Sequence, residues 1–113
     1  MLNNKKFKNN NIVIMNFTGV FENQEFYQDL GAVWLELGDI QGTNCYCDEE
    51  AEAAIKERIS LMGPSGIHFL DSGNYHYVSK IWLDKIEEEF ELLVFDHHTD
   101  MQMPMFGNIL SCG

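Results

Sequence analysis

The stretch of sequence that decides the fold is Leu92–Asp100, which reads Leu-Leu-Val-Phe-Asp-His-His-Thr-Asp. Its first four residues are apolar and rich in β-forming types, which predicts a buried strand of a parallel sheet over Glu91–Phe95. Open α/β sheets place their ligand sites at the carboxyl ends of the strands. Because two carboxylates and two imidazoles follow this strand directly, the sequence predicts a binding site at Asp96–Asp100.

The preceding segment predicts a partner for this strand. Ile67–Leu70 has the composition of a short strand, Asp71–Asn74 that of a turn, and about Tyr75–Glu88 that of an amphipathic helix. A strand, a helix and a strand within about 30 residues predict a right-handed, parallel βαβ unit. Parallel strands end at the same edge of a sheet, so we expect His76 to lie close to the polar residues that follow Phe95.

The first half of the chain predicts further α/β structure. Strands are expected at Asn11–Phe17 and Ala32–Leu37, with a short helix at Gln24–Leu30 between them. Asp48 is a typical N-cap for a helix over about Glu49–Met62. The fold class that follows is a three-layer α/β domain with a mainly parallel sheet.

Length and charge limit the organisation and the partners. A chain of 113 residues forms at most one small domain; we assign it to residues 11–113 and treat residues 1–10 as a flexible leader. Eighteen acidic residues against seven basic ones give a formal net charge of -11, which argues against nucleic acid and anionic membranes as partners. No apolar run approaches the roughly 18 residues that a membrane helix needs, and we expect a cytoplasmic protein.

The cysteines fit that compartment. Cys45, Cys47 and Cys112 are odd in number, and the first two are too close for an easy disulfide. A reducing compartment is therefore expected. Cys45 and Cys47 have neither a second pair nor the spacing of a typical metal site, so all three are interpreted as ordinary thiols.

The donors after the predicted strand favour a transition metal. Asp96, His98 and Asp100 alternate and project to one side of an extended segment, whereas His97 does not. Mixed carboxylate and imidazole ligation suits Mn, Fe or Zn better than Ca or Mg. With His76 from the neighbouring loop, the candidate metal ligands are His76, Asp96, His98 and Asp100.

Two segments resemble a known family. Asp96–Asp100 resembles the Asp-Ala-His-x-Asp motif of the ureohydrolases (arginase, agmatinase and formiminoglutamase), and Gly73–His76 resembles that family's Gly-Gly-Asp-His turn more weakly. The likeness covers roughly residues 66–103. It implies an arginase-like fold and a binuclear manganese centre. By position, His76 would bind one Mn²⁺ and His98 the other, while Asp96 would bridge both and Asp100 would complete the first set.

The resemblance also implies a chemistry and a limit. The family hydrolyses a C–N bond of a guanidino or formimino group, so a cationic or amidine-type small molecule is the expected substrate. His97 and Asn74-Tyr75 depart from the family pattern, and the family's later Ser-x-Asp-x-Asp motif has no counterpart in this sequence. The chain looks like the N-terminal part of a ureohydrolase, apparently truncated, with half of the metal site. Exposed apolar residues of such a sheet predict association, as in a homo-oligomer.

Two alternatives remain open. Asp96-His97-His98 also resembles the Asp-His-His signature of manganese phosphoesterases, and Leu70–Gly73 resembles their preceding strand-end aspartate. Those proteins carry an earlier Asp-x-Asp motif, which is absent from this sequence. The second alternative is an inactive fragment that at most binds metal.

Overall fold

The computed structural model describes residues 9–98, 100–104, 107 and 109–113. Its main feature is a three-stranded parallel sheet in the order β2-β1-β4. The strands are β1 (Asn9–Asn16), β2 (Ala32–Glu36) and β4 (Ile67–Leu70). The predicted class, α/β with a parallel sheet, is confirmed, and each of the three strands falls within two residues of its predicted start. The strand β1 begins at Asn9, inside the segment assigned as a leader; residues 1–8 lie outside the described residues.

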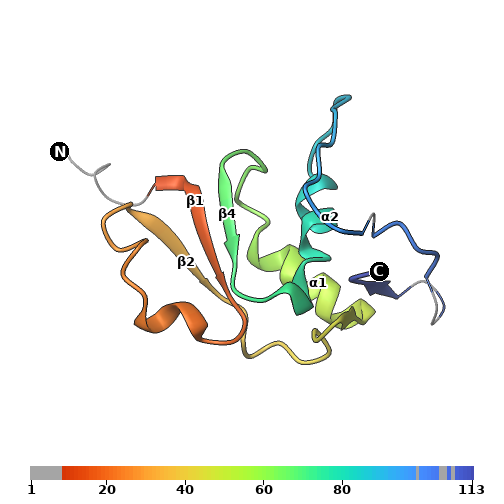
Figure 1. The fold of residues 1–113 in the computed structure, drawn as a ribbon, viewed down its shortest axis with the longest axis horizontal. Helices are drawn as coiled ribbons and strands as arrows, with labels where there is room; N and C mark the ends of the chain where they lie inside the picture. Colours follow the sequence, from red (N-terminus) through yellow and green to blue (C-terminus); the bar gives the residue numbers. More distant parts are fainter. Residues whose placement is uncertain (1–8, 99, 105–106, 108) are drawn as a thin grey trace.

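The helices α1 (Glu49–Arg58) and α2 (Val78–Leu83) lie on one side of this sheet (Figure 1). The predicted N-cap of α1 is confirmed, since the Asp48 carboxylate accepts a hydrogen bond from the backbone N–H of Ala51 at 2.8 Å. Both helices are shorter than predicted: α1 ends four residues before Met62, and α2 has six residues. Short 3-10 helices η2 (Val20–Asn23) and η3 (Gly73–Tyr75), and a two-residue ribbon of β3 (Tyr46–Cys47) and β5 (Leu110–Ser111), complete the elements.

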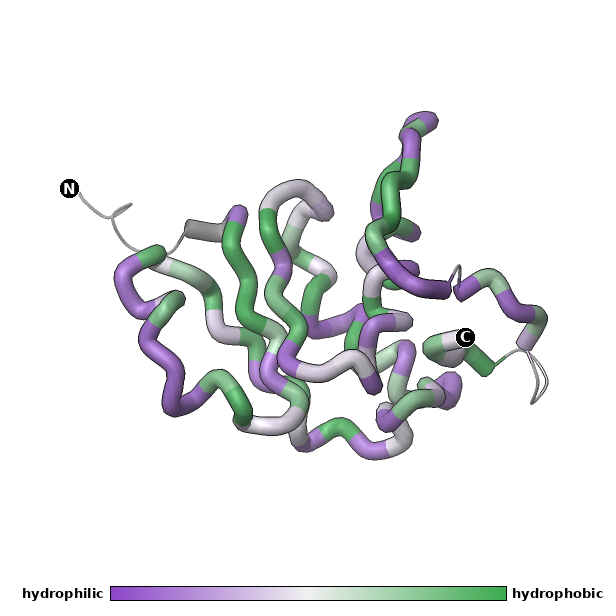
Figure 2. The backbone as a smooth tube through the Cα atoms, in the orientation of Figure 1, coloured by the Kyte–Doolittle hydropathy of each residue, from purple (hydrophilic) through white to green (hydrophobic). Residues whose placement is uncertain are grey.

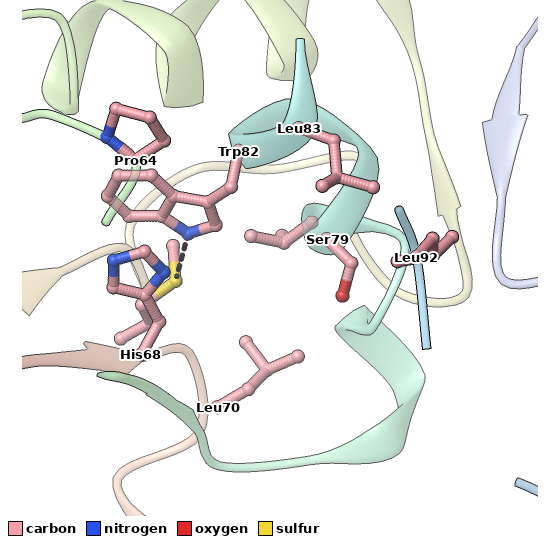
Figure 3. A pocket seen from close by; sticks show the side chains of 9 residues that line it. Pro64, His68, Leu70, Ser79, Trp82, Leu83 and Leu92 are labelled. Atoms are coloured by element: carbon pink, nitrogen blue, oxygen red, sulfur yellow. Dashed lines mark hydrogen bonds between the residues drawn. The ribbon is translucent and has the colours of Figure 1, made fainter. Parts of the chain in front are cut away.

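The main core lies between the sheet and the two helices. Alternation along β1 directs Val13 and Met15 to this side, where they pack with apolar residues of both helices. Trp82 of α2 donates from its indole N–H to the sulfur of Met15 at 3.2 Å, and its ring stacks on His68 of β4 with centroids 3.8 Å apart (Figure 3). His68 is thus an edge-strand residue packed against the core, and its buried Nε2 has no hydrogen-bond partner among the described residues.

The opposite face of the sheet is covered by a loop. Ile14, fully buried, is in register with Trp34 on one side and Phe69 on the other. Phe26 packs edge-on against Phe69, and Tyr27 packs against Trp34. The helix predicted at Gln24–Leu30 is wrong: the segment forms successive turns, which place its aromatic rings on this face. The third layer is therefore a 3-10 and turn segment.

The strand predicted at Glu91–Phe95 is also wrong. Residues 87–98, which we call the arm, contain no helix or strand and are exposed throughout. Figure 1 shows the arm extending beyond α2 and returning, and Figure 2 shows that much of it is hydrophobic. Leu93 and Phe95 are 79% and 90% exposed. Apolarity predicted burial, but the arm forms no strand beside β4, which is left as an edge of the sheet.

Candidate functional site

The candidate site lies where the loop after β4 meets the segment after the arm. Nε2 of His76 lies 3.2 Å from Oδ2 of Asp100, and both side chains are partly exposed. Asp100 adopts a left-handed backbone with φ of 56°, which is uncommon for a residue other than glycine. The contact confirms the expectation that His76 lies close to the Asp96–Asp100 segment.

The turn η3 positions His76 by two local interactions. The hydroxyl of Ser72 accepts from the backbone N–H of Asn74 at 3.2 Å and so caps the turn. The ring of Tyr75 stacks on Phe17, just after β1, with centroids 4.2 Å apart and planes 7° from parallel. These contacts hold the residue before His76 against the carboxyl end of the central strand.

The His76 ring is surrounded by acceptors. Nδ1 lies 2.5 Å from the carbonyl oxygen of Gly73, and Nε2 lies 3.1 Å from that of Cys112 in addition to the Asp100 carboxylate. A neutral imidazole can donate from one nitrogen only, whereas an imidazolium donates from both. Donation from Nδ1 to Gly73 would leave Nε2 free to coordinate a cation, an arrangement that is usual for metal-bound histidines.

Asp96 is held by the backbone that follows it. Its carboxylate accepts from the backbone N–H of His97 at 2.6 Å and, at 3.4 Å, from that of His98. A hydrogen bond with the Asp100 carboxyl, followed by these backbone hydrogen bonds, lowers the pKa of Asp96 from its ordinary value.

The fourth predicted ligand, His98, contacts Asp96 through its backbone N–H. His98 and His97 are exposed at the end of the arm. Within the described ranges, no three His, Cys, Asp or Glu side chains are placed to hold a metal ion. Thr99 lies outside the described residues. The structure thus places the His76 side chain in contact with Asp100, and it places the Asp96 carboxylate against the backbone of His97 and His98.

A groove of about 570 Å³ lies beside the candidate site. His76, Asp96 and Asp100 form part of its polar lining, and α2 together with arm residues 92–95 contributes much of its apolar lining. Polar groups that converge in a largely apolar concavity are typical of small-molecule sites.

Asp71 has a role that the sequence did not predict. Its carboxylate accepts hydrogen bonds from the backbone N–H groups of Phe17 and Thr18 and from the Thr18 hydroxyl, at 2.8 to 3.2 Å. It therefore ties the end of β4 to the end of β1. A strand-end aspartate was visible in the sequence, but its partners lie 53 and 54 residues away, beyond what local spacing indicates.

The buried polar groups beneath the site are fixed as well. The hydroxyl of Tyr77 donates to the carbonyl oxygen of Thr43 at 2.5 Å, which ties the start of α2 to the loop before β3. Burial raises the pKa of Tyr77 above its ordinary value and that of Cys47 to about 11. Burial also raises the pKa of the Cys112 thiol, and the nearby Cys45 adds a smaller electrostatic contribution in the same direction.

Comparison with known proteins gives a relative of unknown role. An uncharacterized protein of Thermotoga maritima is 30% identical over 95 residues, which cover 84% of this chain and 38% of that protein. The chain thus spans well under half the length of the curated relative it matches. No family model and no solved structure matches the chain. Among the described residues, no helix is long and apolar enough to cross a membrane.

Proposed function

We propose that this chain carries part of the metal site of an arginase-like hydrolase that acts on a C–N bond of a guanidino or formimino group. The observation that supports this most is the contact of His76 with Asp100, which joins the loop after β4 to the segment after the arm. Asp96 lines the same groove as His76 and Asp100 and would add a second carboxylate.

The donor set fits Mn²⁺ in chemical type. Imidazole nitrogen and carboxylate oxygen are ligands that this cation accepts, and a positive ion would relieve the repulsion between Asp96 and Asp100. In the proposed site His76, Asp96, His98 and Asp100 hold the metal. Binding of His98 requires the end of the arm to turn toward Asp100. When bound, such a cation lowers the pKa of a coordinated water and makes it a nucleophile near neutral pH.

The chain's own residues then have separable roles. The carbonyl oxygen of Gly73 orients the His76 ring through Nδ1, and the N–H groups of His97 and His98 orient Asp96. The groove beside them offers room for a small amidine-type or cationic substrate, and the net charge of -11 attracts cations. The carboxylates of the family's Ser-x-Asp-x-Asp motif, which a second metal would need, have no counterpart in this sequence.

The phosphoesterase alternative is less well supported. It needs the strand-end aspartate, Asp71, as a metal ligand. Both carboxylate oxygens of Asp71 already accept hydrogen bonds from Phe17 or Thr18, on the β1 side of the turn. The inactive-fragment alternative predicts metal binding of the same residues without hydrolysis.

Calorimetric titration of Mn²⁺ into the purified chain tests the proposal. We expect saturable binding that is weakened at least roughly tenfold by His98→Ala and by Asp96→Ala. His97→Ala is the matched control, because it removes the adjacent exposed imidazole and should leave the affinity unchanged. Equal binding by the wild type and all three variants, or no binding at all, would contradict the assignment.

A further inference from the structure

The β3–β5 ribbon places two cysteines opposite each other. Tyr46 pairs with Ser111 and Cys47 with Leu110, so the next antiparallel pair is Cys45 with Cys112. Cys45 lies just before β3 and has a left-handed backbone, but the backbone N–H of Cys112 donates to its carbonyl oxygen at 3.0 Å, which holds the two residues side by side. Directly opposed residues have Cα atoms about 4.5 to 5.5 Å apart, within the span of about 4.4 to 6.8 Å that a disulfide bridges.

Both cysteines are held by the turn that carries His76. Cys45 has a φ of 65°, and its N–H donates to the carbonyl oxygen of Asn74 at 2.8 Å. The thiol of Cys112 donates to the carbonyl oxygen of Gly73 at 3.3 Å, and its own carbonyl oxygen lies 3.1 Å from Nε2 of His76. Each cysteine is anchored independently to residues 73–76, so their mutual position does not depend on the short ribbon alone.

Cys45 and Cys112 differ from Cys47 in their exposure to solvent. Cys45 and Cys112 are partly exposed, whereas Cys47 is 1% exposed in the core. A small disulfide reagent can therefore reach the pair, and Cys47 is protected.

We propose that Cys45 and Cys112 are a redox-active pair that closes to a disulfide across the β3–β5 ribbon. With glutathione disulfide as the oxidant, the thiolate of one cysteine attacks a glutathione sulfur, and one glutathione thiolate leaves. The second cysteine's thiolate then attacks the protein sulfur of this mixed disulfide and releases the other glutathione. One S–S bond forms, one breaks, and the two protein protons pass to two molecules of glutathione.

The bond would fasten the C-terminal ribbon over the turn that carries His76. Residues 46–111, which include Asp96 and Asp100, would lie inside the closed loop. Oxidation therefore restricts how far the Asp100 segment can move from His76. The bond itself needs only the ribbon register, so its formation does not depend on the proposed metal chemistry.

The test is treatment of the full chain with glutathione disulfide, followed by thiol counting and peptide mapping. Cleavage by chymotrypsin after Tyr46 separates Cys45 from Cys47. We expect reactive thiols to fall from three to one in the denatured chain, with Cys45 linked to Cys112. The oxidised chain should melt roughly 10 °C higher, because the cross-link restricts the unfolded chain.

Cys47→Ala is the matched control, because it removes the buried thiol and should still form the cross-link. Cys45→Ser and Cys112→Ser should lose both the cross-link and the rise in melting temperature, and circular dichroism checks that each variant is folded. A Cys45–Cys47 link, or glutathione adducts that never resolve to an internal disulfide in wild type and Cys47→Ala, would overturn the proposal.

Discussion

At the scale of single residues, Asp71 shows how one side chain sets the edge where the candidate site lies. Its carboxylate binds two consecutive backbone N–H groups after β1, at Phe17 and Thr18. Phe17 in turn stacks on Tyr75, which precedes His76. The position of His76 therefore depends on a hydrogen-bonded corner shared by the two neighbouring strands β1 and β4.

This corner predicts a graded loss of stability. Asp71→Ala removes a charged acceptor and leaves backbone N–H groups without it, so the free energy of unfolding should fall by about 2 kcal/mol. Asp71→Asn keeps one oxygen acceptor and should lose about 1 kcal/mol. Urea unfolding measures both values. If both variants are as stable as the wild type, the corner contributes little to the free energy of unfolding.

The site residues differ in how far the sequence could predict them. His76 does lie close to Asp100, but the strand over Glu91–Phe95 on which that expectation rested does not form, so the contact arises from the loop after β4 and the segment after the arm. The pairing of Cys45 with Cys112 was missed, since it depends on a two-residue ribbon formed by distant segments. The exposed position of His98 was missed, because alternating residues point their side chains to one side only in an extended strand.

At the scale of elements, local sequence patterns correctly predicted the strands and the helix start that tertiary packing also favours. The strands β1, β2 and β4 are short apolar runs bounded by turn residues, and they occupy the sheet as predicted. The helix α1 begins after its predicted Asp48 cap. The extra residues predicted for α1 and α2 do not continue the helices, because helix ends depend on tertiary contacts that periodicity does not show.

The arm is the element for which sequence and structure disagree most. Its apolar residues have the composition of a buried strand, but in the structure four of them, residues 92–95, are 54% to 90% exposed. A strand needs an edge to pair with and a layer to cover it. Within the described residues, the face of the arm away from α2 has no covering layer. The apolar composition of the arm predicts that its burial is favourable, but it does not identify the surface that would bury it.

At the scale of the whole molecule, exposed apolar surface and high negative charge oppose each other. The arm exposes Leu93 and Phe95, while the net charge of -11 keeps chains apart at low salt. The relative from Thermotoga maritima is much longer than this chain, and its matching region is 38% of its length.

This balance predicts salt-dependent association of the isolated chain. Raising the ionic strength screens the charge, so the weight-average mass should increase with salt. The double variant Leu93→Lys, Phe95→Lys should remain closer to the monomer mass at every salt concentration. Sedimentation velocity measures both series, and Val20→Lys is a matched control at an exposed apolar position away from the arm. Association that persists unchanged in the double variant would place the contact elsewhere.

The central claim is that His76 and His98 hold Mn²⁺ together with Asp96 and Asp100. Pulsed electron paramagnetic resonance of the Mn²⁺-loaded chain tests it most directly, because it detects nitrogen nuclei bound to the metal. We predict imidazole nitrogen coupling in the wild type and in His97→Ala, and a reduced coupling in both His76→Ala and His98→Ala. A spectrum without nitrogen coupling, or one that neither His76→Ala nor His98→Ala changes, would contradict the account.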